Sequence, residues 1–128
     1  MAKNKLQLEY PLKSASVSVL WNKIGTPLGL SEWFANEVIV NNNKYLFKWN
    51  NYEETAYLLD IKPLMKIRFQ WEDEIENNTY FELKVETNEI TGEVTLVITD
   101  FTESNEEEDV ILLWDKQIEE LKRKTGMG

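Results

Sequence analysis

The sequence contains no cysteine and no histidine. Without cysteine there are no disulfides and no thiol nucleophiles, and without both residues the common zinc sites cannot form. Ser-His-Asp catalysis, Cys-His catalysis and histidine proton shuttles are excluded for the same reason. Enzymatic chemistry would therefore have to use carboxylates, lysine or tyrosine, or a bound cofactor.

Glycine is scarce, and the five glycines stand at positions 25, 29, 92, 126 and 128. None of them has the spacing of a P-loop or of a dinucleotide-binding loop. The acidic residues Glu72, Asp73 and Glu74 lack the glycine-spaced pattern of a calcium loop, so we interpret them as a solvated segment. The acidic residues are too numerous for a catalytic carboxylate pair to be assigned. We expect no metal and no cofactor.

Positive charge is in deficit, with 14 Lys and Arg against 23 Asp and Glu and a net charge of −9. The longest basic run is Lys122-Arg123-Lys124. This balance opposes binding to nucleic acid or to an anionic membrane. The N-terminus shows no signal peptide, and no apolar run is long enough to cross a membrane. We expect a cytoplasmic protein with no nucleic-acid partner and no membrane insertion.

Aromatic residues, by contrast, are abundant: five Trp, five Tyr and five Phe. Hydrophobic residues make up 42% of the chain and charged residues 29%, a composition typical of a globular protein. A chain of this length suits one domain, residues 1–128, which buries roughly two-thirds of its unfolded surface. Its large rings can fill that core, or they can wall a cavity.

The first third of the chain predicts a strand followed by short helices. Polar and apolar residues alternate over residues 5–12, and Pro11 indicates a sheet edge or the end of the strand. The segment Ser14-Ala15-Ser16 offers N-caps for a short helix at residues 16–24, which carries one apolar stripe and ends at Gly25. Thr26 and Pro27 are typical of a new helix start. A further helical turn is predicted at residues 31–35.

Alternation then predicts six strands, at residues 37–40, 44–49, 54–61, 65–71, 79–87 and 93–101. Asparagines at 41–43 and 77–78 favour turns, because asparagine tolerates left-handed backbone. In the strand at 54–61 we place Tyr57, Leu59 and Ile61 together on one face. Consecutive one-faced strands indicate an antiparallel sheet whose apolar face needs a cover.

That cover is predicted to be a long helix at residues 105–124. Ser104 and Glu107 match a capping box, and acidic residues 106–109 and basic residues 122–124 complement the helix dipole. Gly126 is placed to end the helix. One apolar stripe runs along it: Val110, Leu113, Trp114, Gln117, Ile118 and Leu121. The fold class is therefore α+β, with the helix packed on the sheet.

The candidate site is aromatic. Its proposed lining residues are Phe47, Trp49, Phe69, Trp71 and Phe81 on the strands, Trp114 and Ile118 on the helix stripe, and Trp33 and Phe34 near an entrance. These rings either wall a cavity or fill an ordinary core, and both interpretations stay open. We expect that Trp33 and Phe34, being adjacent, cannot both point into a core from one helical turn. One of them would then guard an entrance or form a contact surface; the alternative is a helix end tucked under the sheet.

The chain resembles the START-like superfamily, also called SRPBCC, which has the helix-grip fold. The resemblance rests on residues 12–16 leading into 20–24, on residues 28–34, on the strand pair 57–63 and 67–71 with its Pro63 turn, and on Trp114 and Leu121 in the closing helix. It extends over residues 5–125. Within the superfamily, the chain looks most similar to the activator-of-heat-shock-chaperone-ATPase homology type.

The resemblance implies a curved antiparallel sheet of about six to seven strands around the long C-terminal helix, with two short helices after the first strand and a cavity inside. Family members bind lipids, hormones or polyketides, a few catalyse cyclisation or hydrolysis, and one branch stimulates a chaperone. The leading hypothesis is non-catalytic binding of a small hydrophobic or amphipathic ligand. The alternatives are a protein-interaction or co-chaperone-like module with a packed interior, and a cyclase- or hydrolase-like enzyme that uses carboxylate or tyrosine groups. The absence of histidine, often used by catalytic members, disfavours the enzyme.

Overall fold

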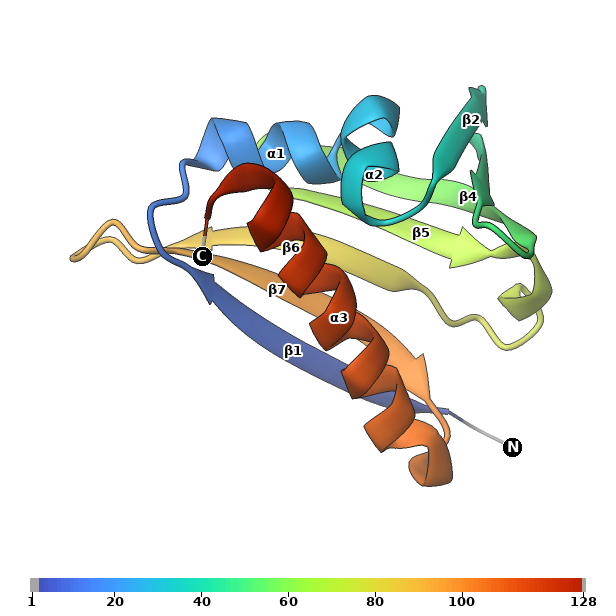
Figure 1. The fold of residues 1–128 in the computed structure, drawn as a ribbon. Helices are drawn as coiled ribbons and strands as arrows, with labels where there is room; N and C mark the ends of the chain where they lie inside the picture. The colour runs from blue at the N-terminus through green and yellow to red at the C-terminus, as the bar shows by residue number, and fades with distance from the viewer. Residues whose placement is uncertain (1–2, 128) are drawn as a thin grey trace.

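The computed structural model describes residues 3–127, and its main feature is one seven-stranded antiparallel sheet with three helices (Figure 1). The strand order is β1-β7-β6-β5-β4-β3-β2. The strands are β1 (Asn4–Leu12), β2 (Glu37–Asn41), β3 (Lys44–Lys48), β4 (Glu53–Lys62), β5 (Lys66–Trp71), β6 (Phe81–Thr87) and β7 (Val94–Thr102). The helices are α1 (Val17–Ile24), α2 (Pro27–Trp33) and α3 (Glu107–Thr125), with short 3-10 turns at Glu72–Glu74 and Ser104–Glu106.

The topology follows from the chain order. Strands β2 to β7 pair with their neighbours in sequence, and β1 returns to the opposite edge beside β7. Asn42 and Asn78 have φ of 58° and 55°, the left-handed backbone predicted for the asparagine turns. Helix α3 crosses the curved face of the sheet diagonally, as Figure 1 shows. The predicted helix-grip architecture, with an antiparallel sheet around the last helix, is confirmed.

The predicted face of β4 is wrong. Ala56 is fully buried and lies opposite Tyr45 of β3 and Trp71 of β5, whereas Leu59 is 48% exposed. The register shifts between Leu58 and Asp60, which places an extra residue in β4. Such a bulge changes which side chains point inward, so the simple period of two does not hold along the strand. Tyr57, Leu59 and Ile61 therefore do not share one face.

The short helices begin as predicted. Ser16 caps α1 by accepting a hydrogen bond from the Val19 amide, and Thr26 caps α2 in front of Pro27. The further helical turn expected at residues 31–35 is not separate, because α2 continues to Trp33 and Phe34 is its C-cap.

The start of α3 differs from the prediction. The capping box is absent: a 3-10 turn at Ser104–Glu106 precedes α3, and no side-chain cap bond is made at Glu106, the residue before the helix. Acidic side chains in the first turn still face the positive end of the helix dipole, and basic ones occupy the last turn. Gly126 ends α3 in the left-handed conformation with φ of 74°.

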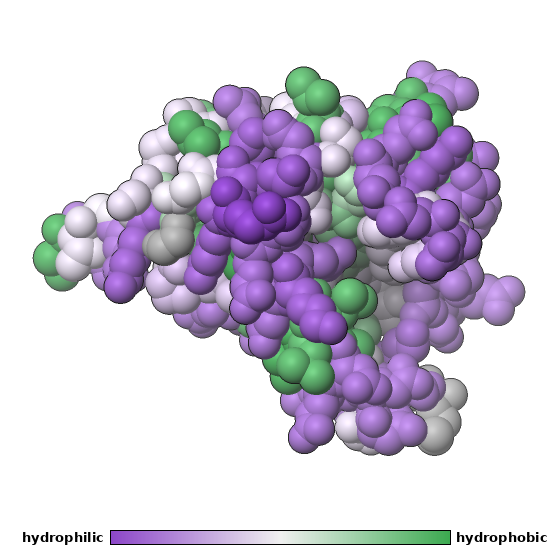
Figure 2. Space-filling view, in the orientation of Figure 1, coloured by the Kyte–Doolittle hydropathy of each residue, from purple (hydrophilic) through white to green (hydrophobic). Residues whose placement is uncertain are grey.

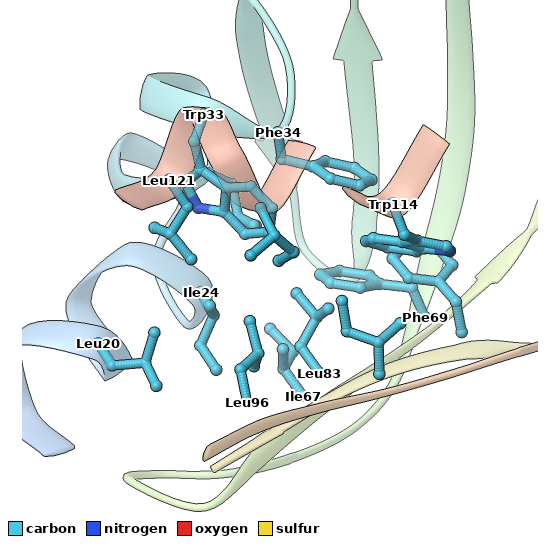
Figure 3. Close-up of a cluster of buried hydrophobic side chains, with 14 of the residues drawn as sticks. Leu20, Ile24, Trp33, Phe34, Ile67, Phe69, Leu83, Leu96, Trp114 and Leu121 are labelled. Carbon is cyan, nitrogen blue, oxygen red and sulfur yellow. The ribbon is translucent and has the colours of Figure 1, made fainter. Parts of the chain in front are cut away.

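The core lies between the helices and the concave face of the sheet (Figure 3). Phe47, Phe69 and Phe81 are fully buried, with ring centroids 5.6 Å apart for Phe47 and Phe69 and 5.3 Å apart for Phe69 and Phe81. Leu20 and Ile24 from α1 pack into the same cluster. The interior at the centre of the sheet is therefore solid, and any space for a ligand must lie beside this packed cluster.

Candidate functional site

Trp33 and Phe34 stand where α2 ends, and both are 95% buried. The expectation that two adjacent aromatics cannot both enter the core is wrong. Trp33 donates a 2.8 Å hydrogen bond from Nε1 to the Lys23 carbonyl, which holds its ring towards α1. Phe34 leaves the helix axis at the C-cap and stacks on Phe81 and Trp114. Figure 3 shows the two side chains diverging, so each fills a different part of the interior.

The other predicted residues divide into two groups. Phe47, Phe69, Phe81 and Ile118 lie in the solid core and line neither the pocket nor the groove described below. Trp49, Trp71 and Trp114 lie with Phe34 around a pocket, while Trp33 lines a neighbouring groove. The predicted set is thus brought together in one aromatic cluster, but only part of it borders open space.

The pocket has a volume of about 280 Å³ and lies between the middle of α3 and the end of the sheet formed by β3, β4 and β5. Its lining residues are Phe34, Trp49, Tyr52, Glu54, Trp71, Asp100, Val110, Leu113, Trp114 and Gln117. Val110, Leu113, Trp114 and Gln117 come from successive turns of α3, and Asp100 from β7. The α3 stripe predicted from the sequence therefore serves as one wall of the pocket.

Hydrogen bonds fix the walls of this pocket. Trp49 Nε1 donates to the Phe34 carbonyl at 2.9 Å, and Trp114 Nε1 donates to Asp100 Oδ2 at 2.9 Å. Gln117 Nε2 donates to the same Phe34 carbonyl at 3.4 Å. Because these hydrogen bonds already hold the indole rings in place, binding a ligand would not require the entropy cost of ordering them.

Two carboxylates lie in the pocket wall. Burial raises the pKa of Asp100, with hydrogen bonds from Trp114 and from the Phe101 amide acting in the opposite direction. Burial also raises the pKa of Glu54, and the nearby charge of Asp73 adds to the shift. Both shifts have the sign expected for carboxyl groups that lose water on folding.

A wider groove of about 450 Å³ continues from the pocket between the end of α2 and the C-terminal half of α3. The pocket and groove share Phe34, Trp49, Leu113 and Gln117. Lys116 and Lys124 lie in the groove together with acidic Glu32 and Glu120, so its rim is polar. The space-filling view shows the surface receding between α3 and the β2–β4 end of the sheet, beside apolar side chains on α3 (Figure 2).

Metal-binding clusters and membrane-spanning helices are absent from the described residues. Residues 3–127 contain no cluster of three or more acidic groups placed to hold a metal ion. No helix of the described chain is long and apolar enough to cross a membrane. The pocket offers two carboxylates, several aromatic rings and one amide, which suit recognition of a bound molecule.

Comparison with known proteins agrees with the fold. Residues 1–127 match the START-like superfamily domain. The chain belongs to the START-like superfamily. No curated protein matches the chain.

Solved structures give this START-like domain several neighbours. The structure of BfR322 from Bacteroides fragilis is 41% identical, with a TM-score of 0.69, and the match covers 97% of this chain and 92% of that one. The Aha1 dimer from Colwellia psychrerythraea is 19% identical over 88% of this chain and 93% of that one, with a TM-score of 0.66. MLL2253 from Mesorhizobium loti is 11% identical over 94% and 95% of the two chains, with a TM-score of 0.74. The last two likenesses concern the fold alone.

Six lining residues of this START-like domain were missed from the sequence: Tyr52, Glu54, Asp100, Val110, Leu113 and Gln117. A signal for Asp100 was available, because it continues the inward set Val94, Leu96 and Ile98 of β7. Glu54 lies opposite the buried Phe47, a pairing that depends on the β3–β4 register. Tyr52 precedes β4 in a loop and carries no periodic signal.

Proposed function

We propose that this START-like domain binds a small amphipathic molecule without chemical turnover, with the 280 Å³ pocket holding one end of the ligand and the adjoining groove the other. The observation that supports this most strongly is the aromatic wall formed by Trp49, Trp71 and Trp114, in which hydrogen bonds hold the indoles of Trp49 and Trp114 in place. Apolar rings with a few placed polar groups are typical of small-molecule sites.

The position of the pocket also supports the proposal. The centre of the sheet is filled by Phe47, Phe69 and Phe81, so a ligand fits beside them, between α3 and the end of the sheet formed by β3, β4 and β5. Leu113 is 58% exposed although it lines both the pocket and the groove. Covering this exposed leucine with an apolar ligand would remove apolar surface from water, which favours binding.

The test uses two adjacent leucines of α3. Leu113 lines the pocket, and Leu112 is similarly exposed at 57% but does not line it. Binding of the neutral dye N-phenyl-1-naphthylamine is measured by its fluorescence in wild type, Leu113→Gln and Leu112→Gln. We expect about fivefold weaker binding for Leu113→Gln, the loss of about 1 kcal/mol of apolar contact, and no change for Leu112→Gln.

Equal effects of the two substitutions, or no dye binding to wild type, would contradict the proposal. Mass spectrometry of the protein purified natively from its own host adds an independent test, since a co-purifying small molecule names the ligand class.

The second candidate is a protein-interaction module. The solid interior favours it, since the aromatic core then serves only stability. Under this alternative, no small molecule is retained in native mass spectrometry, and exposed apolar side chains outside the pocket, such as Ile39, Leu59 and Met65, would contact a protein partner.

A further inference from the structure

We infer that the pocket selects an organic cation: an amphiphile whose ammonium head group lies among Trp49, Tyr52 and Trp71, beside the carboxylates of Glu54 and Asp100. This inference rests on the proposed function and specifies its ligand class. It is carried by three features of the pocket: the sign of its charges, the lack of a partner for one carboxylate, and the arrangement of its rings.

The charges in the pocket have one sign. Glu54 and Asp100 are its acidic lining residues, and neither lysine nor arginine lines it within the described chain. The basic group whose charge acts on Asp100 is Lys3, which is itself ion-paired with Glu74. Lysines 116 and 124 border the groove instead. The interior of the pocket therefore attracts positive charge and repels anionic head groups.

Glu54 lacks a partner. Within residues 3–127 its carboxylate makes no hydrogen bond and no ion pair, although it points to the same side as the buried Phe47. Its surroundings disfavour the ionised form, as the raised pKa indicates. An unpaired carboxylate in a partly dehydrated site is costly, and a ligand cation would compensate for that cost.

The rings around Glu54 are arranged as walls. Trp49 stacks on Tyr52 at 5.0 Å between centroids, and Trp71 stands at 51° to Trp49 with 6.4 Å between centroids. All three rings line the pocket together with Glu54, and aromatic rings attract quaternary ammonium ions. Hydrated inorganic cations, in contrast, prefer six or more oxygen ligands, and two carboxylates do not supply them.

The pocket and the groove together suit the two parts of an amphiphile, its head group and its alkyl tail. A volume of about 280 Å³ is suited to a small head group, and the pocket opens along Leu113 and Phe34 into the larger groove. An alkyl tail leaving the pocket would lie on these apolar side chains. The ligand class is therefore a cationic amphiphile, as distinct from a free metal ion or an anionic lipid.

The experiment compares three ligands of equal chain length: octyltrimethylammonium, 1-octanol and octyl sulfate. Their affinities are obtained by displacement of N-phenyl-1-naphthylamine from the wild-type protein. We expect the ammonium ligand to bind at least about tenfold more tightly than octanol, and octyl sulfate to bind most weakly.

General attraction of a cation to a chain of net charge −9 is controlled by a matched pair of variants. Glu54→Gln and its neighbour Glu53→Gln remove the same charge, but Glu53 is exposed and does not line the pocket. We expect Glu54→Gln to weaken octyltrimethylammonium binding about tenfold and to leave octanol binding unchanged. Glu53→Gln is expected to leave both affinities within about twofold of wild type.

The outcomes separate this inference from the proposed function. Equal affinities for the three ligands would keep the pocket as a binding site and overturn its selection of cations. Equal weakening by Glu53→Gln and Glu54→Gln would also overturn it, because net charge would then explain the preference. If neither the dye nor any of the three ligands binds, both the proposed function and this inference fail.

Discussion

Trp114 of α3 donates a 2.9 Å hydrogen bond from Nε1 to Oδ2 of Asp100 on β7, and this bond joins the helix to the sheet at the pocket wall. The Trp114 ring also stacks near Phe34, with 5.9 Å between centroids, and lies beside Phe81. One residue thus anchors α3, orients a carboxylate and forms part of the pocket. Stability and ligand recognition are therefore coupled through Trp114.

Truncation of Trp114 is expected to be among the most damaging single changes. Trp114→Ala removes a side chain that is 95% buried, at a cost of about 3–5 kcal/mol in the free energy of unfolding. Trp114→Phe keeps a ring but removes the Nε1 donor, at a cost of about 1–3 kcal/mol. Urea denaturation followed by far-ultraviolet circular dichroism measures both. A midpoint near wild type for Trp114→Ala would refute the prediction.

Asp100→Asn is expected to gain stability relative to wild type as the pH rises. Burial raises the pKa of Asp100 in the folded state, and Lys3 and Glu74 are the charged groups that face it. The stability associated with this raised pKa is present at low pH, below the unfolded value, and is lost as the pH rises through the folded value. Asparagine stays neutral and can still accept the hydrogen bond from Trp114, but its Nδ2 cannot accept the bond that the Phe101 amide donates to Asp100 Oδ1. That loss does not depend on pH, so the stability of the variant relative to wild type should rise from acid to pH 7.

The control for this prediction is Asp109→Asn, the same change at an exposed position in the first turn of α3. Asp109 faces the positive end of the helix dipole, so its neutralisation should slightly destabilise the protein at pH 7. Urea denaturation of both variants is measured from about pH 3 to about pH 7, a range that includes the ordinary pKa of a carboxyl group. The explanation is rejected if the stability of Asp100→Asn relative to wild type falls as the pH rises.

Nucleic-acid binding is expected to be absent. The net charge of −9 and the single basic run at the end of α3 offer no surface that would release counterions from a phosphate backbone. An electrophoretic shift assay with duplex DNA at physiological salt and micromolar protein checks this. A shift that weakens with added salt would contradict the prediction.

Strand alternation and the α3 stripe were enough to predict the architecture, because both are local patterns with one buried face. The inward face of β4 was not predictable from alternation, since the shift at Leu58 and Asp60 changes it and arises from pairing with β5. Trp33 and Phe34 were misjudged because the chain leaves the helix between them. Glu54 entered the site only through its register with Phe47. The pocket depends on such tertiary pairings, which carry weak sequence signals.

The packing of α1 against α2 gives the last prediction. At Gly29, an added Cβ would overlap the Asn22 carbonyl oxygen and lie 2.7 Å from Lys23 Cα, so the two helices meet backbone to backbone. Gly29→Ala must push α2 away from α1, which strains the bond from Trp33 to the Lys23 carbonyl. We expect a loss of about 1–3 kcal/mol in the free energy of unfolding.

Because Phe34 follows directly at the end of α2 and forms part of the pocket wall, Gly29→Ala should also weaken binding of N-phenyl-1-naphthylamine. Gly92→Ala is the control: its Cβ would meet no atom within 4 Å, and its cost of about 1 kcal/mol comes from the left-handed backbone, with φ of 75°. This turn lies far from the pocket lining, so dye binding should not change. Urea denaturation and dye titration of both variants decide the matter, and a Gly29→Ala protein with unchanged dye affinity would show that α2 does not position Phe34.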